Sequence, residues 1–552
     1  MMTRKLLPLL CLVALARLAA AQDELHPEDV LGQDRELTLQ QAIGLALQYN
    51  LNLQIVRNDP LLARERIREA QGAFDPNLSG AFQQQHTETP VANSLQALFG
   101  NTADRTVDDS QNYGAGLVGI LPYGPSYSSG YTFNKLASTN ALFGLKPQYT
   151  SAWTNSLTLP LLRDLYWSTP TYLVERSKLD SQISDASFNS QLQDGVFLVE
   201  GSYWALSAAR ALERSTQKGV DTANDLLEQT KVQYQVGTVS KVLVTQAEAG
   251  VAQRESEHIS ALNSVRRAQD TLLTAILQPG VNDYSSTNIR TEEPTFVDYQ
   301  VDANAAVEKA RASRPELYQV QKQLEEAEIA EKWSWNQKLP AFDVGASYTM
   351  NGISGTQKIP PGTPIGFQDD PNTPTLFDPK QVFEPPFGYG TSPGAAHDRY
   401  FAGNGFHNWT FGATLSYPLG NETADSRYIQ RKIELRRAKT SLAREEQDVV
   451  LSVRTAVREL QSSIDAVKAA QRARIASEET LRAEEERLRL GDSTPHNVLL
   501  FQNDLLTAES NEITQLQLYR TAISALERAQ GTLLESRGIS VENERERGMD
   551  KY

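Results

Sequence analysis

Two periodicities alternate along this chain, one typical of α-helices and one typical of β-strands. From Val450 to Val467 the apolar residues are separated by three and four positions, which is the spacing of a coiled-coil seam. The first half begins the same seam with Val196, Val199, Tyr203 and Leu206. No proline lies within residues 172–237 or 419–491. These patterns predict two long helices that end at Gly237 and Gly491, each followed by a short turn.

Four other segments alternate apolar and polar residues and are predicted to be strands, at about 77–86, 151–160, 341–351 and 409–418. Their polar positions carry small, uncharged side chains, and aromatic residues lie near the strand ends. This pattern is typical of an outer-membrane barrel, whose apolar face meets lipid and whose polar face meets a wet lumen. A soluble sandwich is the alternative, because its inner face is also apolar.

The chain repeats itself once. A shift of 254 residues aligns Leu206 with Leu460 and Gly237 with Gly491, and a shift of 264 aligns Ala42 with Ala306 near the start of each copy. We place the first structural repeat at 37–290 and the second at 297–538, between an N-terminal linker at 22–36 and a charged C-terminal tail at 539–552. A sheet of only four strands per chain has unpaired edges, which lipid does not tolerate, so the chain is expected to oligomerise.

Composition narrows the class of protein. The 552 residues carry a net charge of −15, which disfavours binding to nucleic acid. A basic start, a short apolar run and Ala19-Ala20-Ala21 predict a secretory signal peptide at 1–21, whose removal takes the charge to −18. The only cysteine, Cys11, lies inside that run. We find no catalytic string, no cofactor-binding string and no metal-ligand spacing, and we predict that the protein is not an enzyme.

These features together resemble the TolC family of outer-membrane efflux and secretion ducts. The resemblance covers about 37–536. It rests on an ordered set of strings, namely "LTLQQAIGLALQYNLNLQ", "GAFDPNLS", "QKLPAFDV", "LTLPLLRD", "LSYPLGNE", "VQYQVGTVSKVLVTQAEA" and "ERLRLGDSTPHNVLLFQNDLLTAE". It implies an α+β membrane protein, in which a duplicated helix–strand–strand–helix unit forms a trimer. Four strands from each chain would make a 12-stranded outer-membrane β-barrel, continued by a long α-helical periplasmic barrel.

Long inserts separate the paired strands, at 87–150 in the first repeat and 351–408 in the second. The first insert holds a hairpin candidate around Tyr123-Gly124-Pro125, with alternating residues on both sides. It predicts either an extracellular hairpin or two further spanning strands. We favour the extracellular hairpin, because three chains of six strands would make a ring wider than twelve helices.

The resemblance also assigns candidate site residues. Pro160 and Pro418 match the family's proline at the strand-to-helix junction, and Gly237, Val244, Gly491 and Val498 mark the two periplasmic-tip turns. The acidic residues that narrow the pore in well-studied members are replaced here by Asn497 and Leu500. Lys241, Asp492 and Asn497 therefore remain as pore-constriction candidates, with ordinary solvated turn residues as the alternative.

We therefore expect the outer-membrane channel of a tripartite efflux pump or type I secretion system. It would passively export small molecules or proteins to the exterior of a Gram-negative-type bacterium. Its expected partners are two further copies of the chain, outer-membrane lipid, a periplasmic adaptor (membrane-fusion) protein, and an inner-membrane pump or ABC transporter. The alternative is a soluble periplasmic coiled-coil scaffold or adaptor, which would need no alternating strands. The sequence does not name the cargo.

Overall fold

The structure is a computed structural model that describes residues 34–90, 105–140, 143–276, 288–359, 362–369, 379–383, 386–402 and 405–546. The predicted signal peptide at 1–21, most of the N-terminal linker and the last six residues of the C-terminal tail lie outside the described residues.

The chain divides into two compact units, and each unit takes segments from both sequence repeats. The helical unit comprises Met1–Arg64, Leu179–Leu324 and Arg437–Tyr552. The sheet unit comprises Glu65–Lys178 and Glu325–Arg436.

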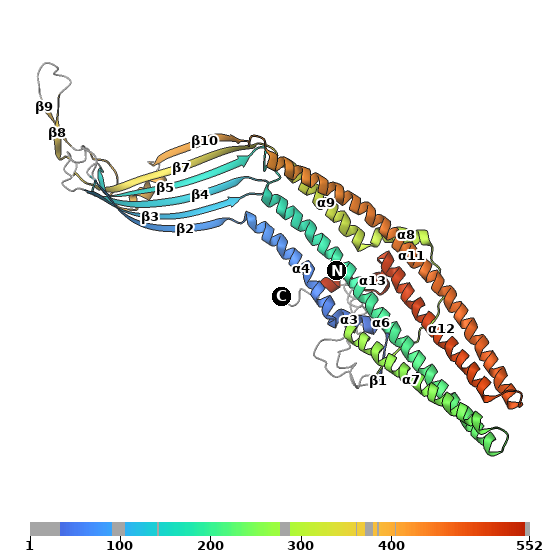
Figure 1. Ribbon diagram of the computed structural model, residues 1–552. Helices are drawn as coiled ribbons and strands as arrows, with labels where there is room; N and C mark the ends of the chain where they lie inside the picture. Colours follow the sequence, from blue (N-terminus) through green and yellow to red (C-terminus); the bar gives the residue numbers. More distant parts are fainter. Residues whose placement is uncertain are drawn as a thin grey trace, which may run out of the picture. The chain divides into compact units, whose positions relative to one another are not determined.

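Two helical hairpins dominate the helical unit (Figure 1). In the first, α6 (Thr169–Gln235) is followed by α7 (Lys241–Ile276), and in the second, α11 (Glu422–Arg489) is followed by α12 (Pro495–Gln530). The long helices contain 67 and 68 residues, which corresponds to about 100 Å each at about 1.5 Å per residue. Among the described residues, no helix is both long enough and apolar enough to cross a membrane.

Shorter elements complete this unit. The parallel strands β1 (Asp34–Leu37) and β6 (Asn288–Thr291) pair with each other. The remaining helices with residues in this unit are α3 (Leu39–Tyr49), α4 (Leu51–Gln71), α8 (Ala303–Ser313), α9 (Pro315–Asn336), α13 (Leu533–Ser536) and α14 (Val541–Glu546). By sequence, α4, α6, α9 and α11 each have residues in both units. Thr38 forms a capping box with Gln41 at the start of α3, and Asp302 caps α8, so polar side chains satisfy the first free N–H groups of these helices.

The seam residues predicted from the sequence form two apolar clusters. One cluster gathers Val199 and Leu206 of α6 with Ala42 of α3. The other gathers Val453 and Leu460 of α11 with Ala306 of α8. These are residues that the repeat alignment pairs, and all six are almost fully buried. The two repeats therefore build equivalent cores from equivalent positions.

The end of the chain is held to the helices by buried charge pairs. The Arg537 guanidinium donates to both carboxylate oxygens of Glu200 in α6, at 2.6 and 3.0 Å, and Glu200 is fully buried. Farther on, Arg57 of α4 pairs with Glu544 of α14, and both side chains are buried. Because removing one partner of such a pair leaves an unpaired buried charge, these contacts fix the C-terminal segment firmly.

One antiparallel sheet forms most of the sheet unit (Figure 1). Its order is β10-β7-β5-β4-β3-β2. The strands are β2 (Asn77–Pro90), β3 (Arg105–Ile120), β4 (Ser126–Ser138), β5 (Leu145–Pro160), β7 (Ala341–Gln357) and β10 (Phe406–Ser416). The other described elements are η1 (Gly72–Phe74), the pair β8 (Pro364–Asp369) and β9 (Pro379–Phe383), and α10 (Ala395–Phe401).

The predicted count of four sheet strands per chain is wrong, and so is the preference for an extracellular hairpin. Within the described residues, this sheet has six strands, because the insert at 87–150 supplies β3 and β4. The hairpin is not an appendage: β3 pairs with β2 from Asn77 to Pro90, and β4 pairs with β5 from Ser126 to Leu136. Each added strand gains ladder hydrogen bonds on both sides, which a hairpin outside the sheet would lack.

Candidate functional site

Both helical hairpins turn at a glycine with the same geometry. Gly237 and Gly491 each have a φ of +81°, in the left-handed region where other residues are strained. The N–H of Gly237 donates to the Tyr234 carbonyl, and the next N–H donates to the Gln233 carbonyl, both at 3.0 Å. Gly491 and Asp492 repeat this pattern. This is the Schellman motif, which satisfies the last free carbonyls of a helix and ends it at the predicted position.

Charged side chains cross-link the second turn. The Arg487 guanidinium lies 2.9 Å from the Glu484 carboxylate and 3.3 Å from that of Asp492. The hydrogen bond to Asp492 and the two negative charges raise the pKa of Arg487. Glu484 itself is buried and accepts a hydrogen bond from Ser493, and Asn497 donates to the Ser493 hydroxyl at 3.4 Å. Asp492 and Asn497 thus belong to one polar network around the turn.

The first turn has a different chemistry at the aligned positions. Glu484, Arg487 and Asp492 correspond to Thr230, Gln233 and Thr238, which carry no charge. Thr230 is buried and donates to the Leu226 carbonyl at 2.7 Å, within its own helix. Lys241, the third constriction candidate, is exposed and is the first residue of α7. The sequence shows these identities, but it does not indicate that the second set forms a network.

The two tip valines differ in burial. Val498 is 2% exposed and packs with Leu226 of α6 and Leu481 of α11 in a small apolar cluster. Val244, its counterpart in the first turn, is half-buried. Gly250 of α7 lies so close to α12 that a Cβ there would meet the Leu499 side chain at 3.0 Å. The two hairpins are therefore packed together near their turns, with Val498 inside the contact.

The first strand-to-helix junction is long and held by side chains. Pro160 is the last residue of β5, and residues 161–168 separate it from α6. Within this linker, the N–H of Asp164 donates to the Asn336 side chain at 2.8 Å, and the Asp164 carboxylate accepts from Gln337 at 2.7 Å. Asp164 has a φ of +68°, which is uncommon for a residue other than glycine. The contacts from the end of α9 and the residue after it hold this conformation.

The turn between β3 and β4 is seated against this linker. The N–H of Tyr166 donates to the Tyr123 carbonyl at 3.1 Å, and the two tyrosine rings lie 5.6 Å apart between centroids. A Cβ on Gly124 would lie 2.4 Å from the Asp164 carbonyl and 2.9 Å from the Pro160 ring. Only glycine fits there, so Gly124 is required for this close approach, although the sequence indicated only that it belongs to a turn.

The second junction is shorter. Residues 417–421 join β10 to α11, with Pro418 and Gly420 between them. The Asn421 side chain donates to the Lys338 carbonyl at 3.1 Å, and the Lys338 ammonium lies 2.8 Å from Asp425 in α11. Among the described residues, no hairpin turn lies against this linker, in contrast to the first junction.

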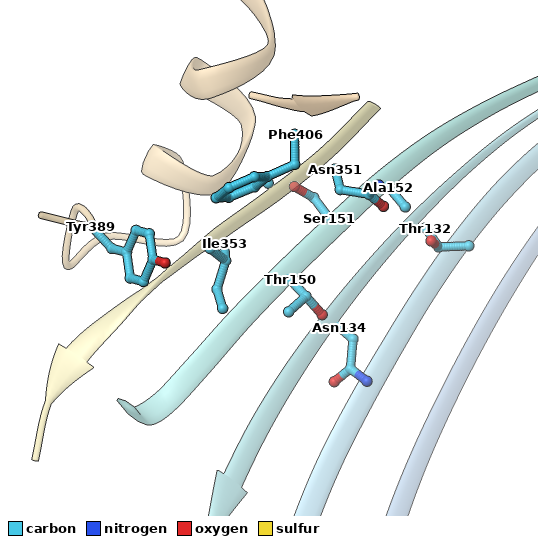
Figure 2. A pocket seen from close by; sticks show the side chains of 10 residues that line it. Thr132, Asn134, Thr150, Ser151, Ala152, Asn351, Ile353, Tyr389 and Phe406 are labelled. Carbon is cyan, nitrogen blue, oxygen red and sulfur yellow. The ribbon is translucent and has the colours of Figure 1, made fainter. Parts of the chain in front are cut away.

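A cavity of about 430 Å³ is lined by residues of the sheet (Figure 2). Its lining residues in β5 and β7 lie toward the strand ends that are away from Pro160 and Ala341. Its lining combines polar residues of β4, β5 and β7 with the apolar side chains of Ala152, Ile353 and Phe406 and with Tyr389; the polar strand residues include Thr132, Asn134, Thr150 and Asn351. Nearby, α10 packs on β5 and β7, and its His397 forms a hydrogen bond with the Tyr131 hydroxyl. The insert at 351–408 thus covers part of this end of the sheet.

Comparison with known proteins identifies the class. The sequence model of the family described as outer membrane efflux protein matches residues 122–276 and 306–532, which is more than half of the chain. The chain belongs to the outer membrane efflux protein family. Membership confirms the resemblance given by the sequence strings, the predicted efflux function at the outer membrane and the prediction that the chain is not an enzyme. The alternative of a soluble periplasmic scaffold or adaptor does not fit this family.

Solved structures support the fold of this efflux protein. The CmeC outer membrane channel of Campylobacter jejuni is 14% identical, with 92% of this chain and 89% of that chain covered and a TM-score of 0.62. The outer membrane protein VceC of Vibrio cholerae is 15% identical, with 89% and 96% covered and a TM-score of 0.58. MtrE of Neisseria gonorrhoeae, solved in its open state, is 15% identical, with 93% and 95% covered and a TM-score of 0.57. No curated protein matches the chain.

These similarities confirm the predicted fold class, in which long helices are combined with a barrel-forming sheet. They extend over nearly the whole length of both chains. The six-stranded sheet of the efflux protein described here is the part of the fold that the sequence analysis did not predict.

Proposed function

We propose that three copies of this chain form a passive duct through the outer membrane. The observation that carries the proposal is the two-faced sheet. Large apolar side chains are strongly exposed on it, including Leu78 at 77%, Trp409 at 76% and Phe411 at 68%. Water disfavours such a surface, whereas lipid stabilises it. The opposite face carries serine, threonine and glycine, which suit a water-filled lumen.

The duct would take its energy from elsewhere. The chain has no nucleotide-binding string of its own. We infer that an inner-membrane pump or ABC transporter drives the cargo, and that a periplasmic adaptor joins that transporter to the hairpin turns around Gly237 and Gly491. The cargo class, small molecule or protein, depends on that transporter.

Gating would take place at the hairpin turns. Seam residues such as Val453 and Leu460 pack the middle of the helices, while the cluster around Val498 is small. The turns can therefore part at a lower energetic cost than the seam can. Lys241, Asp492 and Asn497 are our candidates for the polar constriction, and the Arg487 network would hold the second turn in its closed position.

The test combines mass and conductance. Purified protein in detergent is expected to have the protein mass of a trimer, and it should form pores in planar bilayers. Val498→Asp would place a charge in the buried tip cluster and is expected to increase the open probability, whereas Leu518→Asp, at a position 50% exposed in the same helix and away from the turn, serves as the matched control. A monomer that forms no pores would refute the duct. Equal conductance of both variants and the unmodified protein would refute the gate assignment alone.

A further inference from the structure

We propose that the β-hairpin β3–β4 spans the membrane in each of three copies, so that the closed barrel has eighteen strands. The edge strand β10 of one copy would pair with β2 of the next. This inference rests on the trimeric duct proposed above and changes its width. The partner at each sheet edge is a second copy of this chain.

The hairpin β3–β4 carries the same two faces as the other strands of the sheet. Residues directly paired across strands point to the same side of a sheet. The pairs Phe82–Tyr113 and Tyr113–Phe133 connect β2, β3 and β4 in one row, with ring centroids 5.0 and 6.1 Å apart. The same face continues through β5, β7 and β10 with Leu157, Ala346 and Phe411. An aromatic and aliphatic face of this kind is what a lipid-facing strand presents.

The directions of the strands also permit three copies to close into one ring. Each neighbouring pair in the order β10-β7-β5-β4-β3-β2 is antiparallel, as seen for β2 with β3 and for β10 with β7. Because the number of strands in this order is even, the two edge strands run in opposite directions. A second copy placed beside the first therefore joins through one more antiparallel pair, and three copies of six strands close into a ring without a parallel join.

The strands are staggered along the sheet by an amount that can be compared with that of a barrel. From Asn77 at the start of β2, the paired residues in successive strands lead to Thr410 in β10, six residues before this strand ends at Ser416; the intermediate residues are Val118, Ser128, Ser156 and Ser347. Six residues over five inter-strand steps, at about 3.3 Å per residue and about 4.8 Å per step, give a tilt of about 40°. Outer-membrane barrels have strand tilts of about 35–45°. The six strands are thus already staggered as a segment of such a barrel.

Eighteen strands are compatible with the same twelve helices. The hairpin adds no helix, because β3 and β4 are joined by residues 121–125 at the junction end. This turn rests on the linker 161–168 through the Tyr123–Tyr166 hydrogen bond and the close approach of Gly124 to Asp164. The long linker thus accommodates the extra width. At equal tilt, the barrel diameter scales with strand number, to about one and a half times that of twelve strands.

The first experiment asks whether β3 spans the membrane. Single cysteines replace neighbouring residues of opposite faces, with Gly114→Cys and Ala115→Cys in β3, and Gly412→Cys and Ala413→Cys as the matched pair in β10. A Cβ has space at Gly412 and only ordinary contacts at Gly114. In outer membranes treated with a water-soluble maleimide, we expect the cysteines at 114 and 412 to react and those at 115 and 413 to be protected.

The two cysteine variants in β10 distinguish failure of the eighteen-stranded barrel from failure of the proposed duct. Alternation in β10 together with full reaction at both β3 positions would overturn the eighteen-stranded barrel and leave the duct intact. Absence of alternation in β10 as well would count against the spanning sheet and therefore against both proposals.

The second experiment tests closure. If the start of β2 and the end of β10 of the next copy lie at the same height in the barrel, Asn77 lies opposite Ser416 of that copy. In an antiparallel pair, Ser79 then lies opposite Thr414. Ser79→Cys with Thr414→Cys is expected to form covalent dimers and trimers on oxidation, while Ser79→Cys with Ala413→Cys, on opposite faces, should not. Ser79→Cys with Thr158→Cys would bridge within one chain only if the hairpin left the sheet and β2 paired with β5. Such a bridge would overturn the proposal. Gly412→Cys and Ser416→Cys test pairings shifted by two residues in either direction. The proposal would also be overturned if Ser79→Cys formed no cross-link with a cysteine at 412, 414 or 416 of the next copy.

Discussion

The two repeats of this chain build the same helical hairpin but different amounts of sheet. Leu206 and Leu460 occupy equivalent core positions, and Gly237 and Gly491 make the same turn. The first repeat, however, supplies β2, β3, β4 and β5, whereas the second supplies β7 and β10. A helical seam is constrained at every turn by its packing, while a sheet can grow by a whole hairpin without disturbing the antiparallel order of its neighbours.

The repeats also differ in where they place charge. The first buries Glu200 in contact with Arg537, while the aligned residue in the second is Arg454, which is exposed. The second places the Glu484–Arg487–Asp492 network at its turn, and the first has uncharged residues there. The apolar cores are thus equivalent in the two repeats, whereas the charged groups differ, with a buried ion pair in the first and a network at the turn of the second.

The largest expected effect tests whether the two cores are energetically equivalent. Leu206→Ala and Leu460→Ala each remove a fully buried side chain, and each is expected to cost roughly 3–5 kcal/mol of stability. Thermal unfolding in detergent, followed by helical circular dichroism, should show similar losses for both variants. A large loss at one position with little effect at the other would break the equivalence of the repeats.

The next effect concerns the divergent charges. Glu200→Gln removes the buried carboxylate that accepts two hydrogen bonds from Arg537, and about 3 kcal/mol of stability is expected to be lost, since an ion pair is broken from one side. Arg454→Gln, at the aligned exposed position, should change stability by less than about 0.5 kcal/mol. Thermal midpoints compare the two, and similar losses would mean that the buried pair has no special role.

Periodicity predicted the helices and the faces of the strands, because both depend on local sequence. Gly237 and Gly491 were identifiable because each ends a seam and allows a positive φ. Strand order was not predictable in the same way. Alternation shows which residues share a face, but it does not show that β5 would pair with β7 across nearly two hundred residues. The placement of the hairpin between β2 and β5 is decided by these long-range pairings.

The candidate site shows the same limit. Arg487 and Asp492 are five residues apart and look like ordinary solvated charges in the sequence, and only the turn geometry brings them together. Gly124 was visible as part of a turn, yet its contact with the linker depends on Asp164 and Pro160, which lie about forty residues away. Local patterns find the elements, and the contacts between elements require the fold.

The smallest expected effect concerns the pH dependence that two glutamates of the second repeat, Glu316 and Glu527, contribute to stability. Burial acts to raise the pKa of Glu316, but hydrogen bonds from Ser190 and its own N–H, with the charge of Arg314, lower it overall. A depressed pKa means that ionised Glu316 stabilises the fold above its unfolded pKa of about 4.5, and that this contribution is lost as the pH falls through the folded value. Glu316→Gln should therefore lower the thermal midpoint at pH 7, with a difference that shrinks in acid.

The pKa of Glu527 is shifted in the opposite direction to that of Glu316, so this residue provides an internal control. Burial raises the pKa of Glu527, although Arg537 and Ser536 oppose this shift. Its stabilising contribution is present below the unfolded pKa and is lost as the pH rises through the folded value, so its charge costs stability at neutral pH. The thermal midpoint of Glu527→Gln, relative to that of the unmodified protein, should therefore be higher at pH 7 than in acid. This is the reverse of the trend expected for Glu316→Gln. If both variants followed the same pH trend, the thermal midpoint would be reporting a general effect of acid on the helical unit, and the contrast between the two sites would fail.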